Sequence, residues 1–325
     1  MTIPQLFQSF NKLNVLIIGD VMLDSYIWGT VERISPEAPV PVVSVRKKDY
    51  RLGGAANVAL NIQALGAKPI LCALVGEDDA GKKLQECMKN LSITSEGIVF
   101  SKSRPTTEKT RIIARDQHVV RVDEESDREL DAKEESELLK KINSLIPQCD
   151  VVIFEDYDKG VINASIIEKT VALANQKGIP TIVDPKKRNF LYYTGVSLFK
   201  PNLKELREGL KVDVEGGNQT QVTYAVDLLK QKLNTAGVMV TLSEHGVYID
   251  YQDEKIKLPA HAREIADVSG AGDTVVSIAA LCAALKSDSK TIAFLSNLGG
   301  GLVCQHVGVV PVNKEELLKE ALKFT

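Results

Sequence analysis

The sequence has few of the features that mark a secreted or membrane-bound protein. Its five cysteines are widely spaced and include no Cys-x-x-Cys pair, which is typical of reduced cysteines in a cytoplasmic protein. The longest apolar run, 275–285, is shorter than the roughly 20 residues that span a bilayer. The N-terminus lacks a charged start followed by an apolar stretch, so we expect no secretory signal. These absences predict a cytoplasmic protein with no membrane partner.

The sequence also lacks a strong excess of either charge and has only four histidines. A net charge of −3, with dispersed lysines and arginines, gives no reason to expect nucleic acid as a partner. The histidines share no metal-ligand spacing; they are His118, His245, His261 and His306. With 44% apolar residues, a chain of 325 residues can bury one large core, so we expect a single domain over 1–325.

What the sequence does contain is a regular alternation of short apolar runs with amphipathic helical segments. The expected strands are 15–18, 69–75, 151–154, 181–183 and 237–242, and the expected helices are 55–65, 80–91, 133–145 and 164–176. This alternation predicts an α/β fold with a parallel sheet covered on both faces. Two regions, 40–51 and 97–124, instead show the polar–apolar alternation of half-exposed strands.

The segment 267–274, Asp-Val-Ser-Gly-Ala-Gly-Asp-Thr, has the composition of a turn that opens a helix. Gly270 and Gly272 allow backbone N–H groups to converge, and the helix dipole adds about half a positive charge, so the segment predicts an anion site. A carboxylate at Asp273 would repel a phosphate unless it takes a proton from the hydroxyl that attacks that phosphate. The alternative is a glycine-rich turn in which Asp273 only starts the helix.

A second glycine-rich segment, Gly-Gly-Ala-Ala-Asn-Val-Ala over 53–59, is followed by Gly66 and Gly76. Together with the segment 267–277, it resembles the paired signatures of the ribokinase-like (PfkB) family of sugar and nucleoside kinases. Ile278 departs from the small residue that many members have at its position. An NAD-dependent dehydrogenase is disfavoured, because no Gly-x-Gly-x-x-Gly follows the first strand.

The resemblance implies a ribokinase-like α/β fold: a central, mostly parallel sheet with helices on both faces, and a small β-sheet lid from about 22–52 and 97–124. In this family the lid closes over the sugar and often pairs two subunits, so we expect a homodimer. Four further segments resemble the branch that phosphorylates D-glycero-β-D-manno-heptose 7-phosphate at its 1-hydroxyl, for ADP-heptose and lipopolysaccharide synthesis; they are 33–42, 156–160, 184–186 and 200–206. The chain stops where that branch's bifunctional form continues into a nucleotidyltransferase, so we expect a stand-alone kinase.

The resemblance also assigns roles to the residues of the sugar and transfer sites. Asp273 would be the catalytic base, and the anion hole would consist of Gly270, Ala271 and Gly272. The sugar would be bound by Asp20, Asp24, Gly53, Gly54 and Asn57. Asp20 and Asp24 follow the first strand, where ligands bind in open α/β sheets, although either can simply cap a turn.

For the nucleotide, the resemblance implies ATP with Mg²⁺. Asn202 and Glu205 would organise the Mg²⁺ through its waters, and the same pair can form a helix cap. The nucleotide-binding residues would be Asn202, Leu203, Lys204, Glu205, Thr241, Gly246, Gly270, Gly272 and Asn297. Asp267 and Ser269, with the loop around Gly308, are candidates for a site for K⁺, which many relatives bind.

A substrate that already carries a phosphate needs cations away from the transfer site. The candidates are Lys159, the three basic residues that follow Asp184, and three arginines of the expected lid strands; they are Lys159, Lys186, Lys187, Arg188, Arg111, Arg115 and Arg121. Each can equally be an ordinary surface charge. Another kinase of the family, acting on ribose, fructose or a phosphohexose, remains the alternative function. A catalytically inactive sugar-phosphate-binding regulator is disfavoured, because it would not need Asp273.

Overall fold

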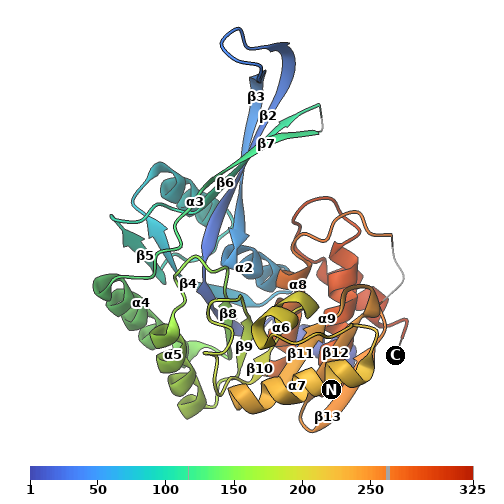
Figure 1. Cartoon of the computed structure of the whole chain (residues 1–325). Coiled ribbons are helices and arrows are strands. Elements are labelled where there is room, and N and C mark those ends of the chain that lie inside the picture. Colours follow the sequence, from blue (N-terminus) through green and yellow to red (C-terminus); the bar gives the residue numbers. More distant parts are fainter. Residues whose placement is uncertain (116, 261–263, 325) are drawn as a thin grey trace.

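The computed structural model describes residues 1–115, 117–260 and 264–324. Its strands form two sheets of unequal size. The larger sheet has nine strands in the order β13-β12-β11-β10-β9-β8-β1-β4-β5 (Figure 1). Its strands are β1 (Asn14–Gly19), β4 (Lys68–Gly76), β5 (Ile98–Ser101), β8 (Val151–Glu155), β9 (Thr181–Asp184), β10 (Leu198–Phe199), β11 (Gly237–Thr241), β12 (Val247–Tyr251) and β13 (Glu254–Leu258). The pairing is parallel from β5 to β11, and β12 and β13 add antiparallel strands at one edge.

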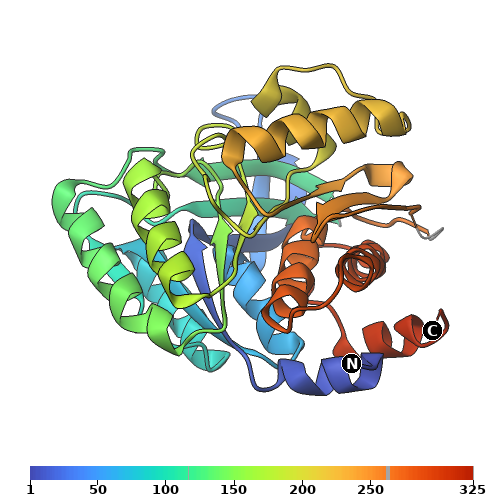
Figure 2. The ribbon, with the colours of Figure 1, turned by 90° about the horizontal axis from the view of Figure 1, so that it is seen from below.

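Helices cover both faces of this sheet, as the alternation of apolar runs and helices predicted. One core lies under α1 (Ile3–Phe10), α2 (Ala55–Ala64), α3 (Asp79–Asn90), α8 (Ala271–Ala284), α9 (Ser289–Val303) and α10 (Lys314–Ala321). The other lies under α4 (Ala132–Leu145), α5 (Ala164–Lys177), α6 (Leu203–Leu210) and α7 (Gln219–Leu233). Within β1, Val15 and Ile17 enter the first core and Leu16 and Ile18 the second, because successive strand residues point to opposite faces. Figure 2 shows the first and last helices side by side.

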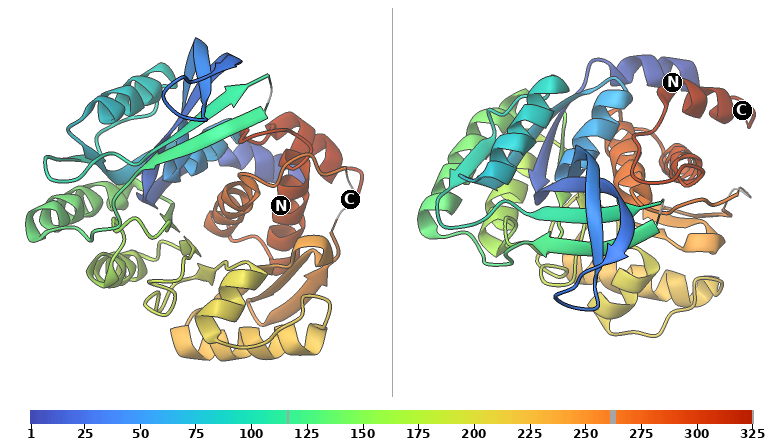
Figure 3. Two further views of the ribbon diagram at one scale, coloured as in Figure 1. Left: turned by 45° about the horizontal axis from the view of Figure 1, so that its top comes forward. Right: turned by 90° about the horizontal axis from the view of Figure 1, so that it is seen from above.

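The smaller sheet has the order β3-β2-β6-β7 and stands away from the main body (Figures 1 and 3). It consists of β2 (Val21–Ile34), β3 (Pro41–Gly54), β6 (Glu108–Ala114) and β7 (Gln117–Glu124). We call it the lid sheet. The long β2–β3 hairpin begins directly after β1 and ends at the start of α2, so the carboxyl end of β1 and the N-terminus of α2 lie at its base.

We expected the whole range 97–124 to contribute to the lid sheet, but one part of it lies elsewhere. Ile98–Ser101 is β5 and pairs with β4 at the edge of the large sheet. The run is short, and its partner strand lies far back in the sequence, so alternation alone could not assign its sheet. The β12–β13 hairpin was not expected either. His261 lies outside the described residues, and no helix among those residues is long and apolar enough to cross a membrane.

Candidate active site

The N-terminus of α8 lies where the carboxyl ends of the parallel strands meet. Gly270 has φ of 79°, in the left-handed region that glycine adopts without strain, and this turn directs the first residues of α8 toward those strand ends. A Cβ at Gly272 would lie 3.4 Å from Asp184 Oδ2 at the end of β9. The first turn of α8 and its dipole therefore face the strand ends, as an anion site requires, although the Ala271 N–H donates to the Val268 carbonyl at 3.3 Å.

Asp273, in the first turn of α8, is held by two side chains from other elements. Asn57, in α2, donates from Nδ2 to Asp273 Oδ2, and Tyr157, just after β8, donates its hydroxyl to Asp273 Oδ1 at 3.0 Å. Burial raises the pKa of Asp273 to about 6, and the nearby charge of Asp184 adds to this rise, while the bond from Asn57 opposes it. A carboxylate with this pKa is largely ionised at neutral pH and suited to accept a proton.

Two further carboxylates lie beside Asp273. Glu155 and Asp184, each the last residue of its strand, offer oxygens that lie within 4.8 Å of one another and of an Asp273 oxygen. The buried Lys200 lies 3.0 Å from Asp184 Oδ2. Burial and the charges of Asp184 and Asp273 raise the pKa of Glu155 well above its ordinary value. Sequence reasoning missed Glu155, Tyr157 and Lys200 as site residues, although each lies at or just after a strand end and Tyr157 and Lys200 fall within the segments 156–160 and 200–206.

Asn202 and Glu205 form the helix cap that their spacing allows. Asn202 Oδ1 accepts from the Glu205 N–H at 2.8 Å, and Glu205 Oε2 accepts from the Asn202 N–H at 2.8 Å. The other Glu205 oxygen accepts from Lys186 Nζ at 2.7 Å. Lys186 also lies 4.0 Å from Asp184, so it belongs to the strand-end cluster rather than to a distant phosphate site.

The two aspartates after β1 have different environments. Asp20 accepts three backbone N–H groups, from Tyr157, Lys159 and Val161, at 2.9 to 3.1 Å. Its carboxylate therefore anchors the loop that carries Tyr157, instead of being free for the sugar. Asp24 is bound by Arg111 across the lid sheet, and a Cβ at Gly53 would lie only 2.4 Å from its Oδ2.

A pocket of about 340 Å³ opens beside Asn57 at the base of the lid sheet. Its walls include Asp24, Tyr26, Tyr50 and Arg51, and the Arg51 guanidinium lies 4.7 Å from the centre of the Tyr26 ring. Gly54, at the end of β3, has φ of 59° and turns the chain into α2. This volume is in the usual range for a small-molecule site. A larger, more open hollow of about 630 Å³ lies against α3 and contains none of the clustered residues.

The remaining residues expected at the site are more scattered. Asp267 accepts from the N–H and hydroxyl of Ser269 and from the Gly308 N–H, so these three residues do lie together. Thr241, at the end of β11, forms an isolated β-bridge with Asn202. Leu203 and Lys204, directly after Asn202, are the first two residues of α6. Gly246 has φ of 85° after a short 3-10 turn (Ser243–His245). Asn297 donates to the Pro259 carbonyl at 2.8 Å.

Two of the cations expected to bind the substrate's phosphate lie away from the pocket beside Asn57. Lys159 Nζ lies 2.7 Å from Glu125, and Lys159 does not line the pocket beside Asn57. Arg115 is exposed in the turn between β6 and β7, at the end of the lid sheet away from the large sheet. In this chain, the structure therefore brings neither residue to the pocket beside Asn57.

The site's oxygen ligands suit Mg²⁺. Glu155 Oε2 is buried and has no hydrogen-bond partner among the described residues, and Asp184 and Asp273 offer oxygens within 4.8 Å of a Glu155 oxygen. Carboxylate oxygens are the ligands that Mg²⁺ prefers, and few are needed because the ion keeps several waters. The residues present therefore fit this metal.

A carboxylate base beside an anion site at the strand ends of an α/β sheet is the arrangement of a phosphotransferase acting on an alcohol. Residues 12–316 match the model of the pfkB family carbohydrate kinases, and the chain belongs to this family. It is therefore a sugar kinase, and the family resemblance read from the two glycine-rich segments is confirmed.

Two similar curated proteins carry the same name. The bifunctional protein HldE of Syntrophotalea carbinolica is 38% identical over 316 residues, which cover 97% of this chain and 64% of that protein. HldE of Helicobacter pylori (strain HPAG1) is 39% identical over 303 residues, which cover 93% of this chain and 65% of that protein. The chain thus spans just under two thirds of the length of these relatives.

Solved structures share the fold. Phosphofructokinase-2 from Escherichia coli in complex with potassium has a TM-score of 0.77 at 17% identity, covering 94% of this chain and 97% of that one. Arabidopsis thaliana ribokinase complexed with ribose and ATP has a TM-score of 0.72 at 18% identity, covering 94% and 99%. The ribokinase-like α/β fold expected from the sequence is confirmed.

Proposed function

We propose that the chain transfers the γ-phosphoryl group of ATP to the 1-hydroxyl of D-glycero-β-D-manno-heptose 7-phosphate, which gives the 1,7-bisphosphate for ADP-heptose and lipopolysaccharide synthesis. The observation that carries the chemistry is the placement of Asp273, buried at the N-terminus of α8 and oriented by Asn57 and Tyr157. The choice of sugar is supported by the HldE relatives, which match across nearly the whole chain.

In the proposed reaction, the Asp273 carboxylate accepts the proton of the attacking hydroxyl while that oxygen bonds to the γ-phosphorus and ADP leaves. The N–H groups of Gly270 and Gly272 would stabilise the charge on the transferring group. Lys186 and Lys200 place two positive charges at the same strand ends. Mg²⁺, when bound, would neutralise phosphate charge near Glu205 and Asp184. We also propose that Asp267, Ser269 and the loop around Gly308 bind a monovalent cation such as K⁺.

The sugar would lie in the pocket beside Asn57. Asn57 Oδ1 is buried and has no hydrogen-bond partner in the part of the chain that the structure describes, so it is available to accept from a sugar hydroxyl. Asp24 lines the same pocket and can accept another hydroxyl. Arg51, on the pocket wall, replaces Lys186 as our candidate for binding the 7-phosphate, because Lys186 lies in the transfer cluster. Its guanidinium pairs with Asp49 at 3.0 Å and would bind the phosphate beside or in place of that carboxylate.

A screen of ATP consumption across sugars and sugar phosphates tests this function. We expect heptose 7-phosphate to be used well above ribose, fructose, hexose phosphates and the free heptose, with a second phosphate at the anomeric carbon by ³¹P NMR. If ribose, fructose or a phosphohexose is used as fast or faster, the protein would instead be assigned as a kinase for that sugar. No ATP consumption with any substrate, from folded protein that binds sugar phosphate, would favour a regulator.

A further inference from the structure

We propose that Asp20 is a positioning residue for the base: its buried carboxylate fixes the loop 156–161 and thereby holds the Tyr157 hydroxyl against Asp273. The proposal rests on the proposed kinase function and deepens it, because it gives Asp20 a part in the transfer step without contact with the sugar or with ATP. Asp20 should therefore affect turnover rather than substrate binding.

The loop that carries Tyr157 directs three backbone N–H groups to one side chain. Asp20 is 2% exposed; its Oδ2 accepts from the N–H groups of Tyr157 and Lys159 at 2.9 and 3.1 Å, and its Oδ1 accepts from the Val161 N–H at 3.0 Å. Strand β1 pairs in parallel with β8, so Asp20, directly after β1, lies beside the residues that follow β8. The backbone of this loop is therefore fixed by a single carboxylate.

The same loop supplies one of the two hydrogen bonds to the base. The Tyr157 hydroxyl donates to Asp273 Oδ1 at 3.0 Å, while the Tyr157 N–H is one of the three donors to Asp20. One residue thus bonds to Asp20 through its backbone and to the base through its side chain. A shift of this loop would move the hydroxyl away from Asp273 and release one oxygen of the base.

Asp20 also contacts the segment that supplies the other hydrogen bond. Its backbone carbonyl accepts the Ala55 N–H at 3.0 Å, at the start of α2, the helix that carries Asn57. A Cβ at Gly54 would lie 2.3 Å from the same carbonyl, so the chain turns into α2 directly against Asp20. The two side chains that donate to Asp273 therefore come from segments that both bond to Asp20.

The contact uses both carboxylate oxygens, so it tolerates little change. Burial raises the pKa of Asp20, while the three N–H bonds and the nearby charge of Arg104 oppose that rise. The bonds thus favour the charged form, in which both oxygens only accept. An amide has one accepting atom, so Asp20→Asn leaves at least one of the three N–H groups facing an NH₂ group.

A double-mutant cycle on kcat tests this role, with Asp20→Asn and Tyr157→Phe measured singly and together on the best substrate of the screen. Each single change should lower kcat by roughly tenfold to a hundredfold, the size of effect that a small misplacement of a reacting group can have. KM for ATP and for the sugar should stay near the wild-type values. Because Asp20 acts through Tyr157, the double variant should lose little more than the larger single loss.

The matched control is Asp78→Asn. Asp78 also accepts backbone N–H groups, from Gly81 and Thr106 at 2.7 Å each, but these belong to the start of α3 and the segment before β6. This variant should lower the unfolding temperature and keep kcat near the wild type. Hydrogen–deuterium exchange without substrate adds a second readout, since residues 156–161 should exchange faster in Asp20→Asn and at the wild-type rate in Asp78→Asn.

Unchanged kcat in Asp20→Asn, or losses that multiply in the double variant, would overturn the positioning role and leave the kinase function standing. A raised KM for the sugar with unchanged kcat would instead place Asp20 in the sugar site. If Asp20→Asn does not fold, Asp20→Glu, which displaces the carboxylate by one methylene, takes its place in the cycle with the same expected outcomes. A wild type that consumes no ATP with any sugar overturns the kinase function, and this role with it.

Discussion

Asn57 and Asp273 lie 216 positions apart in the sequence and are joined by a hydrogen bond from the Asn57 amide to the Asp273 carboxylate. This contact connects the two glycine-rich segments, because Asn57 follows the Gly53–Gly54 turn and Asp273 follows Gly270. The hydrogen bond favours the charged form of Asp273 and thereby limits the rise in its pKa that burial causes.

Asn57→Ala should move the acid limb of the pH–rate profile to higher pH. Without the amide, burial and the charge of Asp184 would raise the pKa of Asp273 further above its value of about 6. Because the base acts when deprotonated, the activity lost relative to wild type should be greater at pH 6.5 than at pH 8.5. The measurement is kcat/KM across this range.

The matched control is Asn61→Ala, one turn further along α2. Asn61 is buried and bonds to the Thr274 hydroxyl and the Val312 N–H, but it does not bond to the Asp273 carboxylate. This variant should lower the unfolding temperature and leave the acid limb in place. An unshifted limb in Asn57→Ala would show that the amide does not tune the base.

Arg51→Ala should raise KM for heptose 7-phosphate by roughly tenfold to a hundredfold, the loss of a charge-assisted contact worth about 1.5–3 kcal/mol. The weak use of free heptose should not change, because that sugar has no phosphate to bind. Steady-state kinetics with both sugars measures the difference. Arg46→Ala, exposed on the same lid hairpin, is the control. Equal losses with both sugars would remove Arg51 from phosphate binding.

Much of this fold could be predicted because its signals are local. The strands β1, β4 and β8 and the helices α2 and α4 lie within a residue or so of the expected ranges, since each is an uninterrupted apolar run or a helical repeat. The role of Asp20 could not be read in this way. Its three N–H donors come from the loop after β8, and only the pairing of β1 with β8 brings them together.

The candidate site, too, could be predicted only where its residues stand in local motifs. Asp273 and Asn57 stand in recognisable motifs, but Glu155 becomes noticeable only once β8 and β9 are paired and Asp184 lies beside it. Lys186 has a basic side chain that suits a remote phosphate, and its actual partner, Glu205, is set by the packing of α6 against the strand ends. Long-range pairing, rather than residue type, decides these roles.

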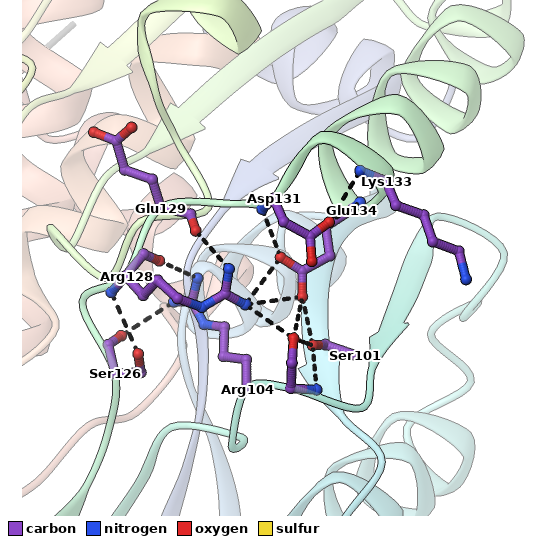
Figure 4. A network of polar contacts seen from close by, with 9 residues as sticks. Ser101, Arg104, Ser126, Arg128, Glu129, Asp131, Lys133 and Glu134 are labelled. Carbon is purple, nitrogen blue, oxygen red and sulfur yellow. Dashed lines mark hydrogen bonds and ion pairs between the residues drawn. The ribbon is translucent and has the colours of Figure 1, made fainter.

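Glu134→Gln should destabilise the fold at neutral pH. Glu134 accepts from Ser101, Arg128 and the Asp131 N–H, in a network that anchors the chain between the lid sheet and α4 (Figure 4). Burial alone would raise the pKa of Glu134, but these bonds hold it below the ordinary 4.5. This stabilisation is therefore complete above pH 4.5 and disappears as the pH falls through the lowered pKa.

Urea unfolding at pH 7.5 should show a loss of about 1–3 kcal/mol for Glu134→Gln, and a smaller loss near pH 4. Glu137→Gln, on the same helix with a more exposed side chain, should stay within about 0.5 kcal/mol of the wild type. An equal loss for Glu134→Gln at both pH values would contradict a stabilising role for its charge.

The lid sheet should form the dimer interface. Val120 and Val122, two residues apart in β7, are exposed at 46% and 54%, and their shared face has the apolar character that a second subunit would cover. Val122→Lys should therefore shift sedimentation toward monomer at micromolar concentration, whereas Val307→Lys, at an exposed valine outside the lid sheet, should not. A monomeric wild type would reject this interface.

The turnover of Asp273→Asn with ATP and heptose 7-phosphate tests the central claim most directly. The change keeps the shape of the side chain and removes the base, so turnover should fall by roughly 10² or more while the protein still folds and binds ATP. In the wild type, kcat/KM should rise with pH through about 6 and then level off, as Asp273 loses its proton. Near-normal turnover by folded Asp273→Asn would contradict the account.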